Sequence, residues 1–212
     1  MDAKVSKRTD DESPHACRRR EEILDAATRL FAEQGYYEAD TQALADRLGV
    51  GKGTLYRYFP SKRELFLAAT DRVMKGLQER ISAAVQGQED PLERLRRGMR
   101  TFLDYFAANP DHVELVILER ALFKDREQPT FLEFRQRNLE RWRDSYRAMI
   151  AEGRIREMPV ERITDVLGSA MYGSMFLTYF MGRPELVAAR ADDVLDVVFH
   201  GILTDSESQK RR

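Results

Sequence analysis

The chain has little cysteine, histidine, glycine or proline, and each shortage excludes a class of protein. The single cysteine, Cys17, cannot form an internal disulfide, so we expect a reducing compartment, the cytoplasm. The three histidines lie far apart without the spacing of metal ligands, so we expect no metal site, and nothing in the sequence calls for a cofactor. The 12 glycines and 7 prolines among 212 residues favour long helices over a turn-rich β fold.

The chain also lacks an excess of charge of either sign and a clear membrane-spanning segment. Its 35 Lys and Arg nearly balance its 36 Asp and Glu, which excludes a uniformly basic surface but not a local basic patch. The N-terminal residues contain no apolar segment, so we expect no secretory signal. The uncharged run 166–182 is short for a bilayer span and contains polar residues, and we interpret it as a buried helix of a protein without a membrane role.

Helical periodicity is what the sequence has in abundance. Apolar residues recur at helical spacing, as at Ile23, Ala27 and Leu30, and 42% of the chain is apolar, enough for a core. We therefore expect an all-α fold. The expected order is a disordered arm (1–17), a three-helix module (18–60), a linking helix (61–86), a body of long helices (87–204) and a disordered tail (205–212).

Residues typical of helix ends divide the N-terminal part. Gly35 is expected to end the first helix as a C-cap, and Thr41 to begin the second as its N-cap. Ser61 and Glu64 have the spacing of a capping box at the start of the linking helix.

The segment 41–65 contains the strongest functional signal. It reads as two short helices joined by the glycine-containing turn 48–51, which is typical of a helix-turn-helix whose second helix enters the DNA major groove. Between Arg47 and Arg63 there are five basic residues and no acidic one, and two tyrosines lie among them. Ammonium, guanidinium and phenol groups suit phosphate oxygens, so this segment predicts DNA binding. Arg18 and Arg19 belong to a second basic cluster, which either contacts DNA or is simply a solvent-exposed charged face.

This segment resembles the DNA-binding domain of the TetR family of bacterial transcriptional regulators. The resemblance rests on LADRLGVGKGTLYRYFPSKREL, preceded by ILDAATRLFAEQGYYEADT, and covers residues 20–66 without gaps. It implies an N-terminal three-helix helix-turn-helix DNA-binding domain and a C-terminal helical domain that binds a small-molecule effector and dimerises. The rest of the chain matches the family only in length and helical character.

Several residues are expected to contact DNA. The resemblance implies phosphate contacts for Thr41, Tyr56 and Lys62, and base or backbone contacts for Arg57 and Tyr58. Gly51 stands where the motif commonly has Ser or Thr, which weakens the expected cap of the second helix. The full set expected at DNA is Arg18, Arg19, Thr41, Gly51, Lys52, Gly53, Thr54, Tyr56, Arg57, Tyr58 and Lys62.

The run 49–54 also looks superficially like a phosphate-binding loop of nucleotide kinases. Such a loop needs a glycine six positions before the lysine, where this chain has Asp46, and it needs a preceding strand. Both are missing, so we reject that interpretation. No spacing of nucleophile, base or paired carboxylates indicates an enzyme elsewhere.

The body is rich in aromatic residues and methionine, which suit either an apolar effector pocket or an ordinary helical core. The resemblance favours a pocket for an apolar or aromatic effector, with His112, Glu119 and Arg120 as candidate polar anchors. The expected lining is Phe102, Phe106, His112, Ile117, Phe134, Trp142, Met171 and Met175.

The last two helices are expected to form a homodimer interface, again by resemblance. Small residues around Gly173 permit close approach, and the expected interface residues are Gly173, Val194, Val198, Phe199 and Ile202. The alternative is that these residues pack only within their own chain. Together these features predict a ligand-responsive homodimer, most simply a repressor, on a palindromic operator in double-stranded DNA. A transcriptional activator and an effector-independent DNA-binding protein of the same fold are the alternatives.

Overall fold

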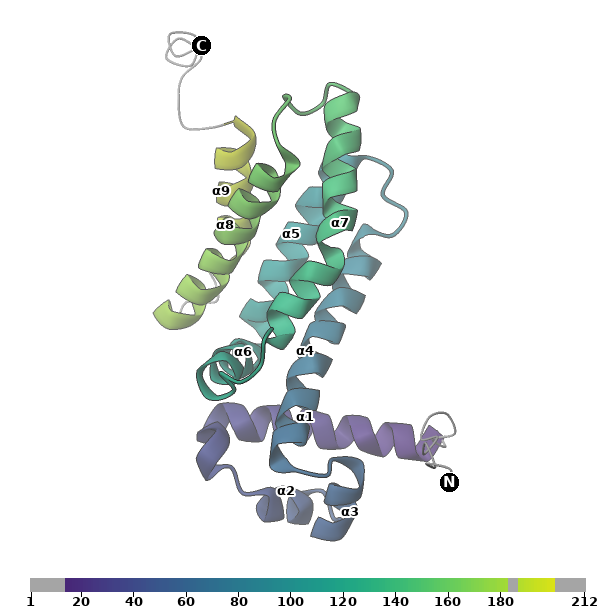
Figure 1. The fold of residues 1–212 in the computed structure, drawn as a ribbon, viewed down its shortest axis with the longest axis vertical. Helices are drawn as coiled ribbons and strands as arrows, with labels where there is room; N and C mark the ends of the chain where they lie inside the picture. The colour runs from purple at the N-terminus through teal and green to yellow at the C-terminus, as the bar shows by residue number, and fades with distance from the viewer. Residues whose placement is uncertain (1–13, 183–186, 201–212) are drawn as a thin grey trace, which may run out of the picture. The chain divides into compact units, whose positions relative to one another are not determined.

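The structure, a computed structural model, describes residues 14–182 and 187–200, of which 187–191 by their backbone alone. In this part of the chain every regular element is a helix, as expected (Figure 1). The helices are α1 (Pro14–Glu38), α2 (Thr41–Arg47), α3 (Lys52–Tyr58), α4 (Lys62–Val85), α5 (Pro91–Ala108), α6 (Pro110–Leu122), α7 (Thr130–Ala151), α8 (Val160–Met181) and α9 (Val187–His200).

Two compact units make up the chain, one up to Ala69 and one from Thr70. The division falls inside α4, whose observed bounds differ by one residue at each end from the expected linking helix. The expected arm is too long, because residues 14–17 already belong to α1. The remainder of that arm and the expected tail 205–212 lie outside the described residues.

The smaller unit is built around the apolar face of α1. Ile23, Leu30 and Phe31 are fully or almost fully buried, and the ring of Phe31 meets that of Phe66 edge to face with centroids 5.0 Å apart. At Gly35 the backbone takes φ 70° and ψ −178°, which interrupts the helical course before the chain reaches Glu38. A positive φ is readily adopted by glycine and strains residues with a Cβ atom.

Side chains cap the starts of α2 and α4. The expectation that Thr41 caps α2 is wrong: Asp40 is the N-cap, its carboxylate accepts from the Gln42 backbone N–H at 2.7 Å, and Thr41 is the first helical residue. At α4 the expected cap is confirmed, because the Ser61 hydroxyl oxygen accepts from the Glu64 backbone N–H at 3.1 Å.

In the larger unit α8 packs against α5 and α7, and α9 packs against α5 and α8 (Figure 1). The core contains Met99, Leu103, Val113 and Met149, each at most 6% exposed. A Cβ atom at Gly76 would come within 2.9 Å of the Tyr105 hydroxyl, which donates to the Val73 carbonyl at 2.8 Å. A larger residue at position 76 would therefore have to displace the Tyr105 hydroxyl from the Val73 carbonyl. No helix in the described ranges combines the length and apolar character of a membrane span.

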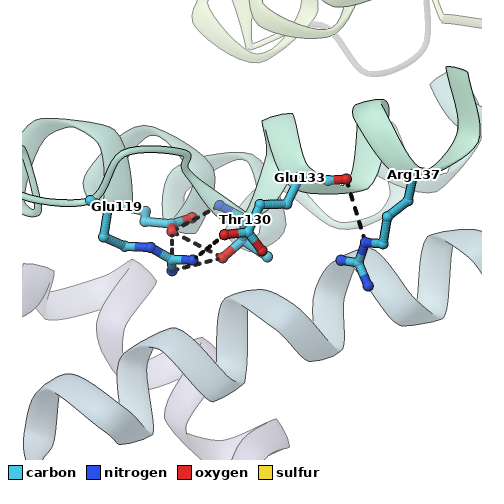
Figure 2. Close-up of polar contacts among 5 residues, drawn as sticks. Glu119, Thr130, Glu133 and Arg137 are labelled. Carbon is cyan, nitrogen blue, oxygen red and sulfur yellow. Dashed lines mark hydrogen bonds and ion pairs between the residues drawn. The ribbon is translucent and has the colours of Figure 1, made fainter.

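A buried carboxylate joins the end of α6 to the start of α7. Glu119 is 1% exposed, and its Oε1 atom accepts from the Thr130 backbone N–H at 3.0 Å and from the Thr130 hydroxyl at 2.9 Å (Figure 2). The Arg126 guanidinium donates to the same oxygen at 2.7 Å and to Glu133 Oε1 at 2.8 Å. These bonds tie the connecting segment 123–129 to both helices.

We expect Glu119→Ala to lower the free energy of unfolding by about 3 kcal/mol, because it leaves the half-buried Arg126 and the start of α7 without their shared acceptor. Glu127→Ala is the matched control: the side chain lies in the same segment but is exposed, and its loss is expected to change stability by less than about 0.5 kcal/mol. Urea unfolding measures both, and equal midpoints for the two variants would contradict the structural role of Glu119.

Candidate functional site

The segment 41–58 folds as a helix-turn-helix. After α2, Gly49 takes φ 64°, and the Val50 backbone N–H donates to the Ala45 carbonyl at 3.0 Å, which reverses the chain toward α3. Leu44 and Leu55 are each 1% exposed, so the two short helices pack through apolar side chains. This burial leaves the opposite face of α3 exposed.

The exposed face of α3 is basic and has little side-chain bulk at its start. Lys52 and Arg57 are exposed, as are Gly51 and Gly53, and a Cβ atom at either glycine would meet nothing within 4 Å. Gly51 is the N-cap of α3 and provides no side-chain hydrogen bond, as its departure from Ser or Thr predicted. A large partner such as a DNA backbone can therefore approach the start of α3 closely.

Thr41 and Tyr56 are brought together by the packing of α2 on α3. Their hydroxyl oxygens are 3.0 Å apart and share a hydrogen bond, and Thr41 is only 6% exposed. Tyr56 is half-buried, so its phenol lies at the border between the core of the unit and the basic surface. A hydroxyl has a single proton to donate, so whichever of the two accepts this bond keeps its own O–H for a phosphate oxygen.

Other expected DNA residues also have partners within the chain. The Lys62 ammonium donates to the Tyr37 carbonyl at 2.8 Å and lies 5.2 Å from the centre of the Tyr36 ring, so it ties α4 to the end of α1. Arg19 pairs with Glu22 at 2.8 Å, and the Arg57 guanidinium lies 5.8 Å from the centre of the Tyr58 ring. Arg18 is exposed on α1 and Thr54 is half-buried on α3.

The larger unit contains two hollows that divide the expected ligand residues. The larger hollow lies among α4, α5, α7 and α8 and measures about 1200 Å³ when the solvent at its open mouth is counted. Four expected residues line it: Phe102, Phe134, Trp142 and Met171. The smaller hollow measures about 610 Å³ on the same basis, lies among α5, α6 and α8, and is lined by the expected Phe106 and Met175. The space that the protein itself encloses is similar in the two hollows, about 190 Å³ in the first and about 210 Å³ in the second.

The other expected ligand residues lie elsewhere. His112 and Ile117 line neither hollow, and the His112 ring packs 5.2 Å from that of Tyr105. Glu119, an expected polar anchor, lines neither hollow and belongs to the α6–α7 connection, and Arg120 is exposed outside both hollows. All four side chains are on α6. The α6 residues that line a hollow are Pro110 and Val113.

The larger hollow has polar residues that the sequence analysis missed. Gln78, Arg94, Asn138, Arg141 and Ser145 line it together with apolar side chains. Three of them lie on α7 at spacings of three and four, on the face that also presents Phe134 and Trp142, so helical periodicity alone could have indicated them. Their presence makes the hollow amphipathic rather than purely apolar.

An ion pair lies beside the start of α5 near one end of the larger hollow, and a buried phenol lies near the other end. The Arg154 side chain, which follows α7, hydrogen-bonds the Asp90 carboxylate and thereby lowers the pKa of that carboxyl. Asp90 is also the N-cap of α5, so this pair fixes where α5 begins. Near the other end, burial raises the pKa of Tyr172 to about 12, so its phenol is neutral at physiological pH.

An apolar stripe runs along one exposed side of α8. Val166, Leu177 and Phe180 are 56%, 50% and 69% exposed, and Gly173 lies between them on the same helical face. On α9, Val197 is half exposed, while Val194, Val198 and Phe199 are half-buried. Of the expected interface residues, Ile202 lies outside the described part of the chain.

A helix-turn-helix unit with a basic recognition helix, joined to a helical unit with an amphipathic hollow, defines a DNA-binding regulator with a separate helical body. The family described as "Bacterial regulatory proteins, tetR family" matches residues 23–69. The nucleoid occlusion factor SlmA of Vibrio campbellii is 32% identical over 152 residues, 68% of this chain and 74% of that protein. The chain therefore belongs to the TetR family of DNA-binding transcriptional regulators.

Other relatives match over different extents. The transcriptional activator FasR of Mycolicibacterium smegmatis is 35% identical over 98 residues, 46% of this chain and 45% of FasR, so the match spans less than half of that protein. The TetR-family regulator PfmR of Thermus thermophilus superimposes with a TM-score of 0.70 at 28% identity, covering 87% of this chain and 97% of PfmR. FadR of Bacillus subtilis in complex with stearoyl-CoA has the same fold, with a TM-score of 0.71 at 20% identity over 86% of this chain and 99% of FadR.

Proposed function

We propose that the protein is a homodimeric regulator that binds a palindromic operator and releases it when a fatty acyl thioester, or a similar anionic amphiphile, occupies the larger hollow. The observation that carries this proposal is the lining of that hollow, which combines a long apolar surface with two arginines. A dimer that leaves DNA upon ligand binding acts as a repressor wherever its operator overlaps a promoter.

The arginines favour an anionic ligand over a purely apolar one. Arg141 is exposed at the hollow, and no ion pair or hydrogen bond of its guanidinium is found within residues 14–182 and 187–200. The Arg94 guanidinium donates twice to the Gln88 carbonyl, at 2.7 and 3.1 Å, which positions it without neutralising its charge. Guanidinium groups bind phosphate and carboxylate oxygens in a bidentate manner.

The apolar part of the lining suits a hydrocarbon chain. Leu95, Met99, Phe102, Leu167 and Met171 line the hollow, and flexible methionines adapt to ligands of variable shape. FadR of Bacillus subtilis, which has the same fold, was solved with stearoyl-CoA. That protein guides the choice of probe, while the argument for this chain comes from its own residues.

A single helix could transmit ligand binding to the DNA-binding unit. α4 contributes Gln78, Ile81 and Val85 to the hollow, and its first residues, from Lys62, belong to the DNA-binding unit. A ligand that prefers one position of α4 therefore shifts the dimer toward that position. Coupling between two such sites is commonly worth about 1–3 kcal/mol.

The effector is tested by measuring binding of lauroyl-CoA and stearoyl-CoA and the release of operator DNA that follows. We expect at least one thioester to bind and to lower DNA affinity, and Arg141→Ala to weaken that binding about tenfold through the loss of a charge-assisted contact. Arg137→Ala is the control, because Arg137 is exposed on the same helix but lies outside the hollow. Equal losses in both variants would contradict a specific role of Arg141.

For DNA, we propose that α3 enters the major groove, with Lys52 at a phosphate and Arg57 at a base. Lys52→Ala is then expected to weaken binding to all sequences alike and to reduce the slope of log affinity against log salt by about 1. Arg57→Ala is expected to relax the preference at one operator position at a cost of about 1–3 kcal/mol. Selection of operator fragments at one stated salt concentration provides the sequence, and Lys75→Ala in α4 serves as the control. A loss confined to one base position in Lys52→Ala would contradict the phosphate assignment.

The exposed stripe of α8 supports a dimer with two-fold symmetry, in which the same patch of each protomer meets its copy. A Cβ atom at Gly173 would meet nothing within 4 Å, so this part of the face is open to close approach by another helix. Contiguous exposed apolar residues of this kind commonly mark an interface.

We expect Leu177→Glu to convert the dimer to a monomer and to reduce operator affinity, because a charge would be buried in the interface. Leu132→Glu is the matched control, since Leu132 is exposed to a similar degree, 46% against 50%, but belongs to α7 and not to the α8 stripe. Light scattering after gel filtration measures the mass of each. A Leu177→Glu variant that stays dimeric would show that another surface forms the dimer.

A second candidate is a DNA-binding factor without an effector. The SlmA of Vibrio campbellii, described as a nucleoid occlusion factor, matches over more of the chain than FasR does. Unchanged operator affinity in the presence of every thioester tested would favour this candidate. FasR is described as an activator, so reporter expression with and without the protein is the measurement that separates repression from activation.

A further inference from the structure

The two hollows follow one another along the same pair of helices. On α5 the larger hollow ends with Met99 and Phe102, and the smaller one begins with Leu103 and Phe106. On α8 the order is the same. Tyr172 is the last α8 residue of the larger hollow, and Met175 is the first of the smaller one. Because α5 and α8 pack against each other, the hollows lie in series rather than on opposite sides of the unit.

A cluster of aromatic rings separates the two hollows. The Phe102 ring lies 5.6 Å from that of Tyr172 and 5.1 Å from that of Phe106, centre to centre, and both contacts are edge to face. Phe131 supports the cluster from α7, with its ring centre 4.3 Å from that of Tyr172. Phe102 lines the larger hollow and touches a ring that lines the smaller one, so it stands at the boundary.

The two hollows differ in the charge of their lining residues. Arg94 and Arg141 line only the larger hollow, whereas the side chains around the smaller one carry no formal charge. Under the proposed function, the anionic head group binds at the larger hollow, and the attached chain points toward Phe102 and the smaller hollow beyond it. The α5 residues from Leu95 to Ala107 line one hollow and then the other, over about 18 Å at 1.5 Å per residue.

We propose that Phe102 and Tyr172 form a partition that sets the longest hydrocarbon chain the protein accepts, and that the smaller hollow is a second subsite for the chain end when the Phe102 ring moves aside. This inference rests on the proposed function, because it concerns the same amphiphilic ligand. A chain that stops at the partition buries its methylenes only in the larger hollow. Each pair of additional methylenes buried beyond it is worth about tenfold in affinity.

The test is the affinity of the full-length protein for octanoyl-, lauroyl-, palmitoyl- and stearoyl-CoA, each below its micelle concentration. In the unaltered protein we expect affinity to rise with chain length and then to level off. In Phe102→Ala the levelling-off should move to longer chains, and the ratio of stearoyl to lauroyl affinity should rise at least about tenfold. Phe102→Leu is a milder variant that keeps an apolar side chain should the alanine variant fold poorly, and it should shift the ratio in the same direction.

Two further variants separate the partition from a general loosening of the core. Leu139→Ala removes a buried α7 side chain that lines neither hollow, and it should leave the chain-length profile unchanged. Adding Ala107→Phe to Phe102→Ala fills the smaller hollow, which Ala107 lines, and should restore the original profile.

The outcomes distinguish this proposal from the proposed function. If thioesters bind but Phe102→Ala, Phe102→Leu and the unaltered protein share one profile, the partition is overturned while the effector class stands. If Leu139→Ala shifts the profile as much as Phe102→Ala does, the partition is overturned too. If the folded, DNA-binding protein binds no thioester, the effector class fails and the partition fails with it.

Discussion

The packing of α8 against α5 and α7 is the constraint on which the larger unit depends. One side of α8 supplies Met171, Tyr172 and Met175 to the two hollows, and another side exposes Leu177 and its apolar neighbours. A helix with 3.6 residues per turn presents both sides at once. Under the proposed function, a ligand that moves α8 therefore also moves the surface that meets the second protomer.

The smaller unit also depends on tertiary packing, because two of its helices are short. α2 and α3 have seven residues each, too few for a stable isolated helix, so they persist because Leu44 and Leu55 are buried together. The hydrogen bond between Thr41 and Tyr56 joins α2 to α3, and the bond from Lys62 to the Tyr37 carbonyl joins α4 to the end of α1. Lys52 and Arg57 are exposed on α3, which leaves their charges to act outward.

The helices and the helix-turn-helix were predictable because their signals are local. Gly49 marks the turn, the basic run marks the exposed face, and Ser61 caps the start of α4 as its position indicated. The interior contacts were less predictable. Glu119 looked like a ligand anchor, yet its partners are Arg126, in the non-helical connection 123–129, and Thr130, at the start of the next helix, and helical periodicity does not extend across such a connection.

The sequence by itself determined the helical fold, the DNA-binding motif and the apolar faces of the body, because capping, turn geometry and amphipathic spacing act within a few residues. Only the tertiary structure decided that Phe102 and Trp142 line one hollow, that Phe106 lines another and that His112 lines neither. A hollow exists where side chains from several helices fail to fill the space between them. That depends on how distant segments pack, which no local pattern contains.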